Sequence, residues 1–299
     1  MIKMQLTFLG TAAMVPTKDR NHSGFFLDYK DEGILFDCGE GIQRQFRMAG
    51  IKITRVTKIL ISHWHGDHVL GLPGLIQTLG ASEYSEVLEI YGPVGTKERF
   101  KAMFDAFVFD RRLDMKIEEV KEGIFFQNKN FSLEAFELEH KVKTFGFRFV
   151  EEDRRRIDVK AVKKLGIPPG PLLGKLQDNK VVTFKGKKIS PKDTTYTVEG
   201  KKIAYIADTV LCNNCYKLAK DADVLVCEST YASNLLSKAE EYYHMTSKQA
   251  ALIASKANAE KLILTHFSNR YKNTQELEED ARNVFDNTLC AYDLMKVKV

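Results

Sequence analysis

The chain has few of the features from which disulfide frameworks, membrane spans and signal peptides are built. Its cysteines number five in 299 residues, an odd count in a long chain that favours a reducing compartment over a disulfide framework. No apolar run approaches the length that crosses a membrane. The first residues, MIKMQLTFLG, pass directly into an alternating strand pattern that leaves no room for a signal or transit peptide. We therefore expect a cytoplasmic protein with no membrane partner.

Histidine is also scarce, and the little that is present is concentrated. Three of the seven histidines stand within the stretch ILISHWHGDH, residues 59–68, together with an aspartate. The apolar residues 59–61 predict the end of a buried strand. A protein core does not easily hold so many polar side chains unpaired, so this cluster needs a chemical explanation.

Several predicted strands end in a polar side chain, and most of these side chains can bind metals. The residues that follow such strands are Asp37, His63, His140, Asp208, Glu228 and His266. Helix-like segments lie between many of the strands, at 69–79, 96–107 and 246–257. This alternation predicts a layered α/β fold, in which ligand sites gather at the carboxyl ends of strands. A polar turn residue explains any one of these positions, but it explains the concentration of histidine poorly.

The segment 151–195 differs from the rest of the chain. It is rich in lysine and has weak periodicity, and its first part, 151–180, holds three of the seven prolines. Between residues 141 and 202 there are 17 Lys and Arg against 7 Asp and Glu, a net of +10, whereas the remaining residues sum to −5. A charge run is often only a solvated face, but this asymmetry indicates a polyanionic partner. We expect a single domain over residues 1–299 with a protruding basic arm inserted at 151–195.

The spacing of the histidine cluster fits metal binding. His63 and His65 are two positions apart on a strand end and point the same way, and Asp67 and His68 follow them. Imidazoles with a few carboxylates suit Zn²⁺, with Mn²⁺ or another divalent ion as an alternative. His140, Asp208 and His266 bring the candidate ligands to seven. That number exceeds one tetrahedral shell and fits two ions ~3.5–4 Å apart.

The pattern His-x-His-x-Asp-His after a buried strand resembles the defining motif of the metallo-β-lactamase superfamily. The supporting pieces follow in the superfamily's order, with Asp37 in FDCGEG, His140, Asp208 in IAD and His266 in THF. The resemblance implies a four-layer αβ/βα sandwich with two zinc ions at one edge. One ion would be held by His63, His65 and His140 and the other by Asp67, His68 and His266, with Asp208 bridging. Asp67 would also orient the attacking water or take its proton, and Asp37 would accept an imidazole N–H or cap its strand.

Three further stretches resemble the short form of the ribonuclease Z family. VPTKDRNHSGFFL matches a Pro-x-Lys-x-Arg-Asn loop, EYYHMTSKQAA a His-Ser/Met-Thr loop, and GIPPGPLLGKL the Gly-Pro stretch of a protruding arm. The resemblance implies RNA contacts from Lys18, Arg20, Asn21, Thr246, Gly170 and Pro171. One departure is visible, because Cys227 stands where the family commonly has a histidine. The glutamate that follows this position in the family is present here as Glu228. A role is therefore assigned to Glu228 but not to the residue before it.

The resemblance implies a zinc-dependent endoribonuclease that removes the 3′ trailer from precursor tRNA. Cleavage would leave a 3′-hydroxyl on the tRNA and a 5′-phosphate on the trailer. His244 would protonate the leaving ribose oxygen with Glu228 orienting its ring, although His244 could instead be a helix-start hydrogen bonder. The arm would grip the tRNA body through Lys163, Lys164, Lys175 and Lys180. A homodimer is implied as well, since in the family one subunit's arm serves the other's active site.

Two other function classes remain open at this point. One is a metallo-β-lactamase-fold phosphodiesterase or arylsulfatase-like hydrolase of small molecules, against which the basic arm counts. The other is an RNA-binding protein without catalysis, against which the intact ligand set counts, because unpaired buried His and Asp are costly. His22 is either an RNA contact or incidental. The pair Cys212 and Cys215 has no second pair to complete a metal site, and we expect it to be structural.

Overall fold

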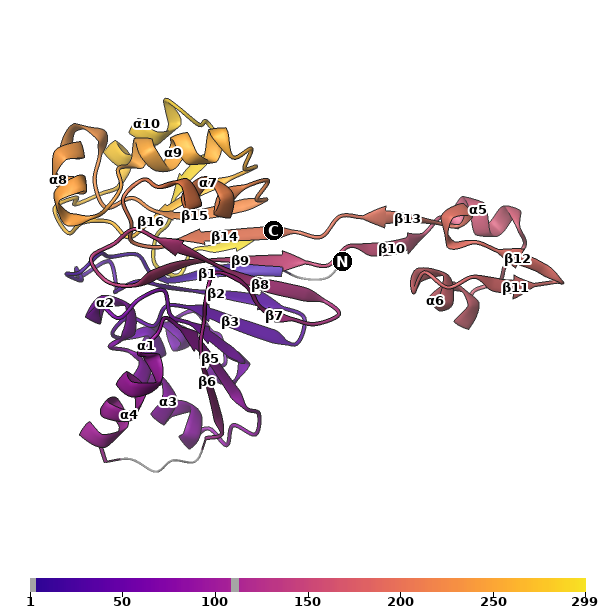
Figure 1. Ribbon diagram of the computed structural model, residues 1–299, viewed down its shortest axis with the longest axis horizontal. Coiled ribbons are helices and arrows are strands. Elements are labelled where there is room, and N and C mark those ends of the chain that lie inside the picture. The colour runs from indigo at the N-terminus through magenta and orange to yellow at the C-terminus, as the bar shows by residue number, and fades with distance from the viewer. Residues whose placement is uncertain (1–3, 109–112) are drawn as a thin grey trace. The chain divides into compact units, whose positions relative to one another are not determined.

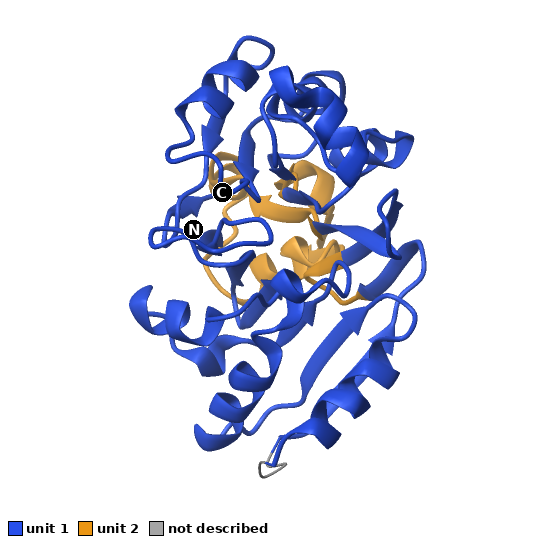
Figure 2. Ribbon diagram, turned by 90° about the vertical axis from the view of Figure 1, so that its left-hand side faces the viewer, with its two compact units in different colours: residues 1–126, 133–149, 202–299 blue, residues 127–132, 150–201 orange. Residues whose placement is uncertain are grey.

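The computed structural model describes residues 4–108 and 113–299, and the chain divides into two compact units, coloured separately in Figure 2. Unit 1 comprises Met1–Phe126, Leu133–Phe149 and Lys202–Val299. Unit 2 comprises Gln127–Ser132 and Val150–Lys201. The longer segment of unit 2 therefore contains the whole of the basic stretch 151–195.

Unit 1 is built on two large sheets, and the first is formed mainly by the N-terminal part of the chain (Figure 1). Among the described residues it has seven strands, in the order β18 (Lys296–Lys298), β1 (Met4–Gly10), β2 (Gly24–Tyr29), β3 (Glu32–Phe36), β4 (Lys58–Leu60), β5 (Leu88–Gly92) and β6 (Met115–Glu119). The strands β18, β1, β2 and β3 pair antiparallel, whereas β3 to β6 pair parallel. The parallel half brings several strand carboxyl ends to one edge.

The second sheet also has seven strands within the described part of the chain. Their order is β17 (Thr288–Cys290), β16 (Leu262–Thr265), β15 (Val224–Glu228), β14 (Lys202–Ile206), β9 (Thr144–Glu151), β8 (Phe131–Leu138) and β7 (Gly123–Gln127). The strands β14 to β17 pair parallel. Their carboxyl ends supply the second set of polar side chains predicted from the sequence.

Helices cover the outer face of each sheet in unit 1 (Figure 1). The first sheet carries α1 (Ile42–Met48), α3 (Leu72–Ala81) and α4 (Thr96–Ala106), and the second carries α7 (Asn213–Ala219), α9 (Ser247–Lys256) and α10 (Gln275–Arg282). Shorter elements of unit 1 are α2 (Gly66–Val69), α8 (Leu236–Tyr242) and the 3₁₀ turns Ile53–Arg55 and Ser233–Leu235. Over residues 4–108 and 113–299, none of the helices has the length and apolarity needed to cross a membrane.

The helices predicted over 96–107 and 246–257 are confirmed within a residue at each end. The single helix predicted over 69–79 is wrong at its start, because the chain forms α2, breaks at Gly71 and begins α3 at Leu72. A Cβ at Gly71 would lie 2.1 Å from the carbonyl oxygen of Gly39, and the Gly71 N–H donates to Cys38. The close approach of these two loops therefore fixes the break.

The two sheets of unit 1 pack face to face through buried aromatic rings. Phe25 and Phe36 stack with their centroids 4.4 Å apart, and Tyr205 of the second sheet meets Phe25 edge-on at 5.0 Å. Tyr29 of the first sheet meets Phe149 of the second at 5.1 Å. Aromatic pairs of this geometry add to the free energy gained from burial. With helices outside both sheets, the result is the predicted four-layer αβ/βα sandwich.

Unit 2 is a small folded body in spite of its weak sequence periodicity. It contains the two-stranded sheets β10–β13 (Arg154–Ile157 with Thr195–Val198) and β11–β12 (Val182–Phe184 with Lys187–Ile189). It also has helices α5 (Val159–Lys164) and α6 (Pro171–Gln177) and a 3₁₀ turn at Pro191–Asp193. Its own apolar core consists of Val162, Ile167, Leu176, Val182 and Ile189. A core of five side chains is too small to impose a clear pattern on the sequence.

Candidate metal centre

The predicted ligands and the supporting Asp37 lie at strand ends of both sheets in unit 1 or shortly after them, as do Asp67 and His68 in α2 after β4. Asp37 directly follows β3, and His266 directly follows β16. Both residues have left-handed backbone, with φ of 56° and 60°. That conformation is uncommon for side chains other than glycine and is found preferentially at functional sites. It turns the chain as soon as the strand ends.

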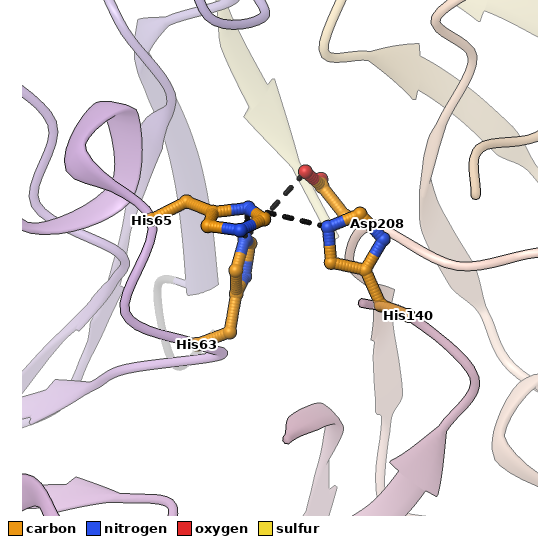
Figure 3. A group of neighbouring side chains, drawn as sticks. All are labelled: His63, His65, His140 and Asp208. Carbon is orange, nitrogen blue, oxygen red and sulfur yellow. Dashed lines mark hydrogen bonds and ion pairs between the residues drawn. The ribbon is translucent and has the colours of Figure 1, made fainter. Parts of the chain in front are cut away.

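A first cluster joins His63, His65, His140 and Asp208, whose side chains converge in Figure 3. His63 Nε2 lies 3.0 Å from His65 Nδ1, and His140 Nε2 lies 3.2 Å from the same atom. Asp208 Oδ2 is 3.7 Å from His63 Nε2. One ligand atom from each of the four residues lies within 4.8 Å of the others.

A second cluster joins Asp67, His68 and His266. His68 Nε2 lies 3.3 Å from His266 Nε2, and Asp67 Oδ2 lies 3.4 Å from His266 Nε2. Asp208 faces this cluster too, because its Oδ2 is 3.4 Å from His68 and its Oδ1 is 3.4 Å from His266. Asp208 thus stands between the two clusters.

Protein oxygens hold the Nδ1 atoms of four histidines and leave Nε2 to face the centre. Ser62 Oγ lies 3.0 Å from Nδ1 of His63, Asp37 Oδ2 lies 2.8 Å from that of His68, and Thr230 Oγ1 lies 3.0 Å from that of His266. The Tyr243 carbonyl lies 2.8 Å from Nδ1 of His140. Such outer contacts fix the ring orientation of metal-binding histidines.

Asp37 is the most extensively bonded of these supports. Its carboxylate accepts hydrogen bonds from the Ser62 N–H at 2.7 Å, the Ser62 hydroxyl at 2.8 Å and the Tyr205 hydroxyl at 2.8 Å. These three donors hold the carboxylate in place beside His68. Asp37 therefore makes the imidazole contact expected for it.

Electrostatics favour neutral imidazoles in the first cluster and carboxylates throughout. Burial holds the pKa of His63 well below its ordinary value and also lowers the pKa of His65 and His140. Burial alone would raise the pKa of Asp208, but the neighbouring His266 and His68 outweigh it and hold that pKa well below its usual range. Neutral imidazoles and ionised carboxylates are the forms that bind metal ions.

The same residues fit a divalent metal better than a network of hydrogen bonds. Asp208 Oδ1 is buried without a hydrogen-bond partner, which is costly unless a cation is close to it. Ring nitrogens of His63 and His140 both face the same nitrogen of His65. In a network of hydrogen bonds, these nitrogens would have to share a proton, or their lone pairs would face one another. The clusters therefore form a divalent metal site.

His244 and Glu228 form a pair beside the second cluster. The Nδ1–H of His244 donates to Glu228 Oε1 at 3.0 Å. Glu228 is itself fixed by the Thr209 N–H at 3.0 Å and the Thr230 hydroxyl at 2.7 Å. Burial alone would lower the pKa of His244, but Glu228 outweighs it and raises that pKa to about 9. The imidazole is thus held protonated, with Nε2 directed away from Glu228.

A cavity of about 550 Å³ opens over the clusters. It is lined by ligands and by Met14, Leu70, Lys141 and Tyr242. The Met14 N–H donates to Asp67 Oδ2 at 2.8 Å, and the Met14 carbonyl lies 3.0 Å from His22 Nε2. His22 is buried in the wall of the cavity, where it supports the loop that contains Met14.

Two residues expected to contact RNA are used by the protein itself. Arg20 is 9% exposed, and its guanidinium donates to the carbonyls of Tyr271 at 2.5 Å and Ser268 at 3.4 Å. Thr246 is 1% exposed and caps α9 by accepting from the Gln249 N–H. Both side chains therefore already have partners inside the fold, and their contacts with RNA stay predictions.

The other expected RNA contacts remain accessible. Lys18 has 90% of its side chain exposed. Asn21 is half-buried, and its amide donates to the Glu40 carbonyl at 2.7 Å. In unit 2 the expected contacts are exposed and belong to α5, α6 or the segments beside them: Lys163, Lys164, Gly170, Pro171, Lys175 and Lys180.

The sequence did not reveal several supporting residues. Ser62, Thr230 and the Tyr243 carbonyl each contact an expected ligand. Tyr205 contacts Asp37, and Thr209 contacts Glu228. Hydroxyls are common in loops and carry no distinctive spacing. Only their neighbours in sequence, Asp208, Glu228 and His244, pointed toward them.

Comparisons with known proteins agree with this geometry. Residues 4–152 match the family described as anti-Pycsar protein Apyc1, and residues 180–267 match the beta-lactamase superfamily domain. The chain is 40% identical to ribonuclease Z of Picosynechococcus sp. over 99% of this chain and 96% of that protein. It is 40% identical to ribonuclease Z of Methanothermobacter thermautotrophicus over 99% and 97%. The crystal structure of the short form of human tRNase Z aligns with a TM-score of 0.72 and 29% identity, covering 98% of each chain. The chain therefore belongs to the ribonuclease Z family, on the metallo-β-lactamase fold.

Proposed function

We propose that this protein is a zinc-dependent endoribonuclease that removes the 3′ trailer from precursor tRNA. The observation that carries the proposal is the convergence of all seven expected ligands in two adjoining clusters, with a cavity that His244 also lines. The full-length likeness to proteins named ribonuclease Z supplies the substrate class. The product ends would be a 3′-hydroxyl on the tRNA and a 5′-phosphate on the trailer.

The two clusters correspond to two ions. His63, His65 and His140 would hold one ion, Asp67, His68 and His266 the other, and Asp208 would lie between them. Zinc suits this donor set of imidazoles and carboxylates, as does Mn²⁺ to a lesser degree. When bound, such ions supply a water nucleophile at neutral pH and neutralise charge on the phosphate oxygens.

The side chains of the protein supply positioning and protons. Asp67 orients the attacking water or accepts its proton, and the Met14 N–H fixes one of its carboxylate oxygens. His244 donates a proton from Nε2 to the leaving ribose 3′-oxygen, because Glu228 occupies its Nδ1. Without that proton the leaving group would be a costly alkoxide.

Unit 2 is the proposed tRNA-binding arm of a single metallo-β-lactamase-fold domain. It holds 14 Lys and Arg against 7 Asp and Glu, and its exposed lysines can contact phosphates. A-form RNA is recognised by shape and backbone rather than by base edges, which suits a basic surface. The homodimer implied by the resemblance is part of the proposal, and light scattering of the purified protein tests it.

The proposed location is the cytoplasm. All five cysteines are free thiols, as expected for a reducing compartment.

The test is a comparison of substrates. Purified protein is incubated with a 3′-extended tRNA precursor, with a small phosphodiester and with an aryl sulfate. We expect specific cleavage of the precursor that is abolished by chelation, restored by Zn²⁺ and lost in Asp208→Ala. Efficient turnover of either small substrate without cleavage of the precursor would favour the small-molecule hydrolase instead.

A further inference from the structure

Two cysteines lie side by side at the start of α7, shortly after Asp208 in the chain. Cys212 caps the start of α7 and Cys215 lies in its first turn, with their sulfur atoms 3.5 Å apart. A disulfide bond is ~2.0 Å long, so an approach of roughly 1.5 Å would join them. The spacing alone suggested a structural pair, whereas the structure shows that the two sulfurs are already in contact.

The two thiols differ in the way that a reactive pair requires. The two sulfur atoms are in hydrogen-bond contact, in which either thiol can donate, and this contact together with nearby backbone N–H groups lowers the pKa of Cys212 to about 6. The same contact, reinforced by burial, raises the pKa of Cys215. Cys212 is also the more accessible, with 8% of its surface exposed against none for Cys215. Cys212 is thus the nucleophile and Cys215 the thiol that resolves its oxidised form.

The other three cysteines are buried like this pair, but for each of them burial is the main influence and raises its pKa. Cys38, Cys227 and Cys290 therefore remain protonated at neutral pH, and protonated thiols react slowly. The chemistry is confined to one pair.

The pair is linked to the catalytic side chains through Thr209. The Thr209 hydroxyl lies 4.0 Å from the sulfur of Cys212 and accepts from the N–H of Glu139, the residue before His140. The Thr209 N–H donates to Glu228, which orients His244. When Cys212 moves toward Cys215, Thr209 loses its contact with the Cys212 sulfur. Thr209 is the residue that bonds to both Glu139 and Glu228.

We propose that Cys212 and Cys215 are a reversible oxidation site that forms a disulfide on exposure to hydrogen peroxide, and that this disulfide slows RNA cleavage. The Cys212 thiolate attacks one peroxide oxygen, so an S–O bond forms, the O–O bond breaks and the departing oxygen leaves as water after taking a proton. Cys215 then attacks the sulfenic sulfur, forming the S–S bond, breaking the S–O bond and releasing a second water. The two thiols lose two electrons in total, and the peroxide gains them. A dithiol reductant reverses the change.

Formation of the disulfide is tested by mass spectrometry, which does not depend on the proposed function. The reduced holoenzyme is treated with dilute hydrogen peroxide, alkylated and digested with trypsin. Both cysteines fall in the tryptic peptide 203–217, whereas Cys227 falls in 221–238. We expect peptide 203–217 to lose the mass of two hydrogen atoms and to escape alkylation. Alkylation of both thiols after peroxide, or a cross-link between the two peptides, would overturn the assignment.

The effect on cleavage rests on the proposed function and is tested separately. We expect peroxide to lower precursor cleavage by wild type roughly tenfold or more, with recovery in dithiothreitol, because His244 loses part of its support. Cys215→Ser cannot form the disulfide and should retain most of its activity under brief treatment, whereas the control Cys290→Ser should respond like wild type. Equal loss in wild type and Cys215→Ser, or a disulfide with unchanged cleavage, would refute the link. A reduced wild-type protein that cleaves no precursor would instead refute the proposed function.

Discussion

The imidazole of His244 donates from Nδ1 to the buried carboxylate of Glu228 across 3.0 Å. This contact gives His244 a pKa of about 9, so the ring is protonated at neutral pH. Because a general acid must hold its proton, we expect the cleavage rate to fall as the pH rises through that pKa. Glu228→Gln removes the charge that raises the pKa, so the alkaline fall should move to lower pH. A single-turnover pH–rate profile of both proteins measures this shift.

Substitution of His244 itself separates catalysis from metal binding. Its ring also lies near Asp208 and His266, where it could be a ligand. If it is the general acid, His244→Ala should retain metal and tRNA binding and lower the cleavage rate roughly 10²–10⁴-fold. Metal analysis that shows a lower metal content in His244→Ala would assign it to the ligands instead.

Metal content distinguishes two ions from one. Seven ligands exceed one tetrahedral shell, so we expect about two ions per chain. His68→Ala should lower the content to about one, because His68 belongs only to the second cluster. Atomic emission analysis of wild type and variant, with Cys290→Ser as a matched control, gives the counts. An unaltered count in His68→Ala would exclude the two-ion arrangement.

His22 and Met14, in the wall of the cavity, are predicted to affect cleavage by holding Asp67 in place. His22 holds the Met14 carbonyl, and the Met14 N–H holds Asp67. His22→Ala should free this loop and lower the maximal cleavage rate by roughly ten- to a hundredfold without loss of metal. His22→Gln can still donate to the carbonyl and should recover much of the rate. Equal activity of His22→Ala and wild type would show that the loop acts independently of Asp67.

Unit 2 is predicted to contribute to binding of the precursor and not to the hydrolysis step. Unit 2 contributes no residue to the metal clusters, so deletion of 151–195 should leave hydrolysis of a small phosphodiester nearly intact and weaken precursor binding strongly. Loss of both activities would show that the arm supports the fold.

Four exposed lysines of unit 2 refine that test. Replacing Lys163, Lys164, Lys175 and Lys180 with Ala should flatten the dependence of log affinity on log salt by up to about four units. The matched control replaces Lys97, Lys101, Lys220 and Lys256, which are exposed on unit 1. Equal effects of the two sets would mean that net charge, rather than the arm, drives binding.

The metal centre was more predictable from the sequence than the surroundings of the loops that were expected to bind RNA. A ligand must be His or Asp at a strand end, so the chemistry itself leaves a pattern, as at His63, His65 and Asp208. Arg20 and Thr246 carried family motifs, yet their side chains are consumed by partners inside the fold. The partners of Arg20 lie about 250 positions away along the chain, and no local pattern encodes such a contact. The break at Gly71 was missed for the same reason.

The central claim is that water, activated at the metal centre, cleaves precursor tRNA. Determination of the product ends tests it most directly. A 3′-extended precursor is incubated with the protein, and the two fragments are probed for a 3′-hydroxyl on the tRNA body and a 5′-phosphate on the trailer. The account predicts both groups. A 2′,3′-cyclic phosphate on the tRNA body with a 5′-hydroxyl on the trailer would contradict it, because those ends arise from attack by the neighbouring ribose hydroxyl rather than by water.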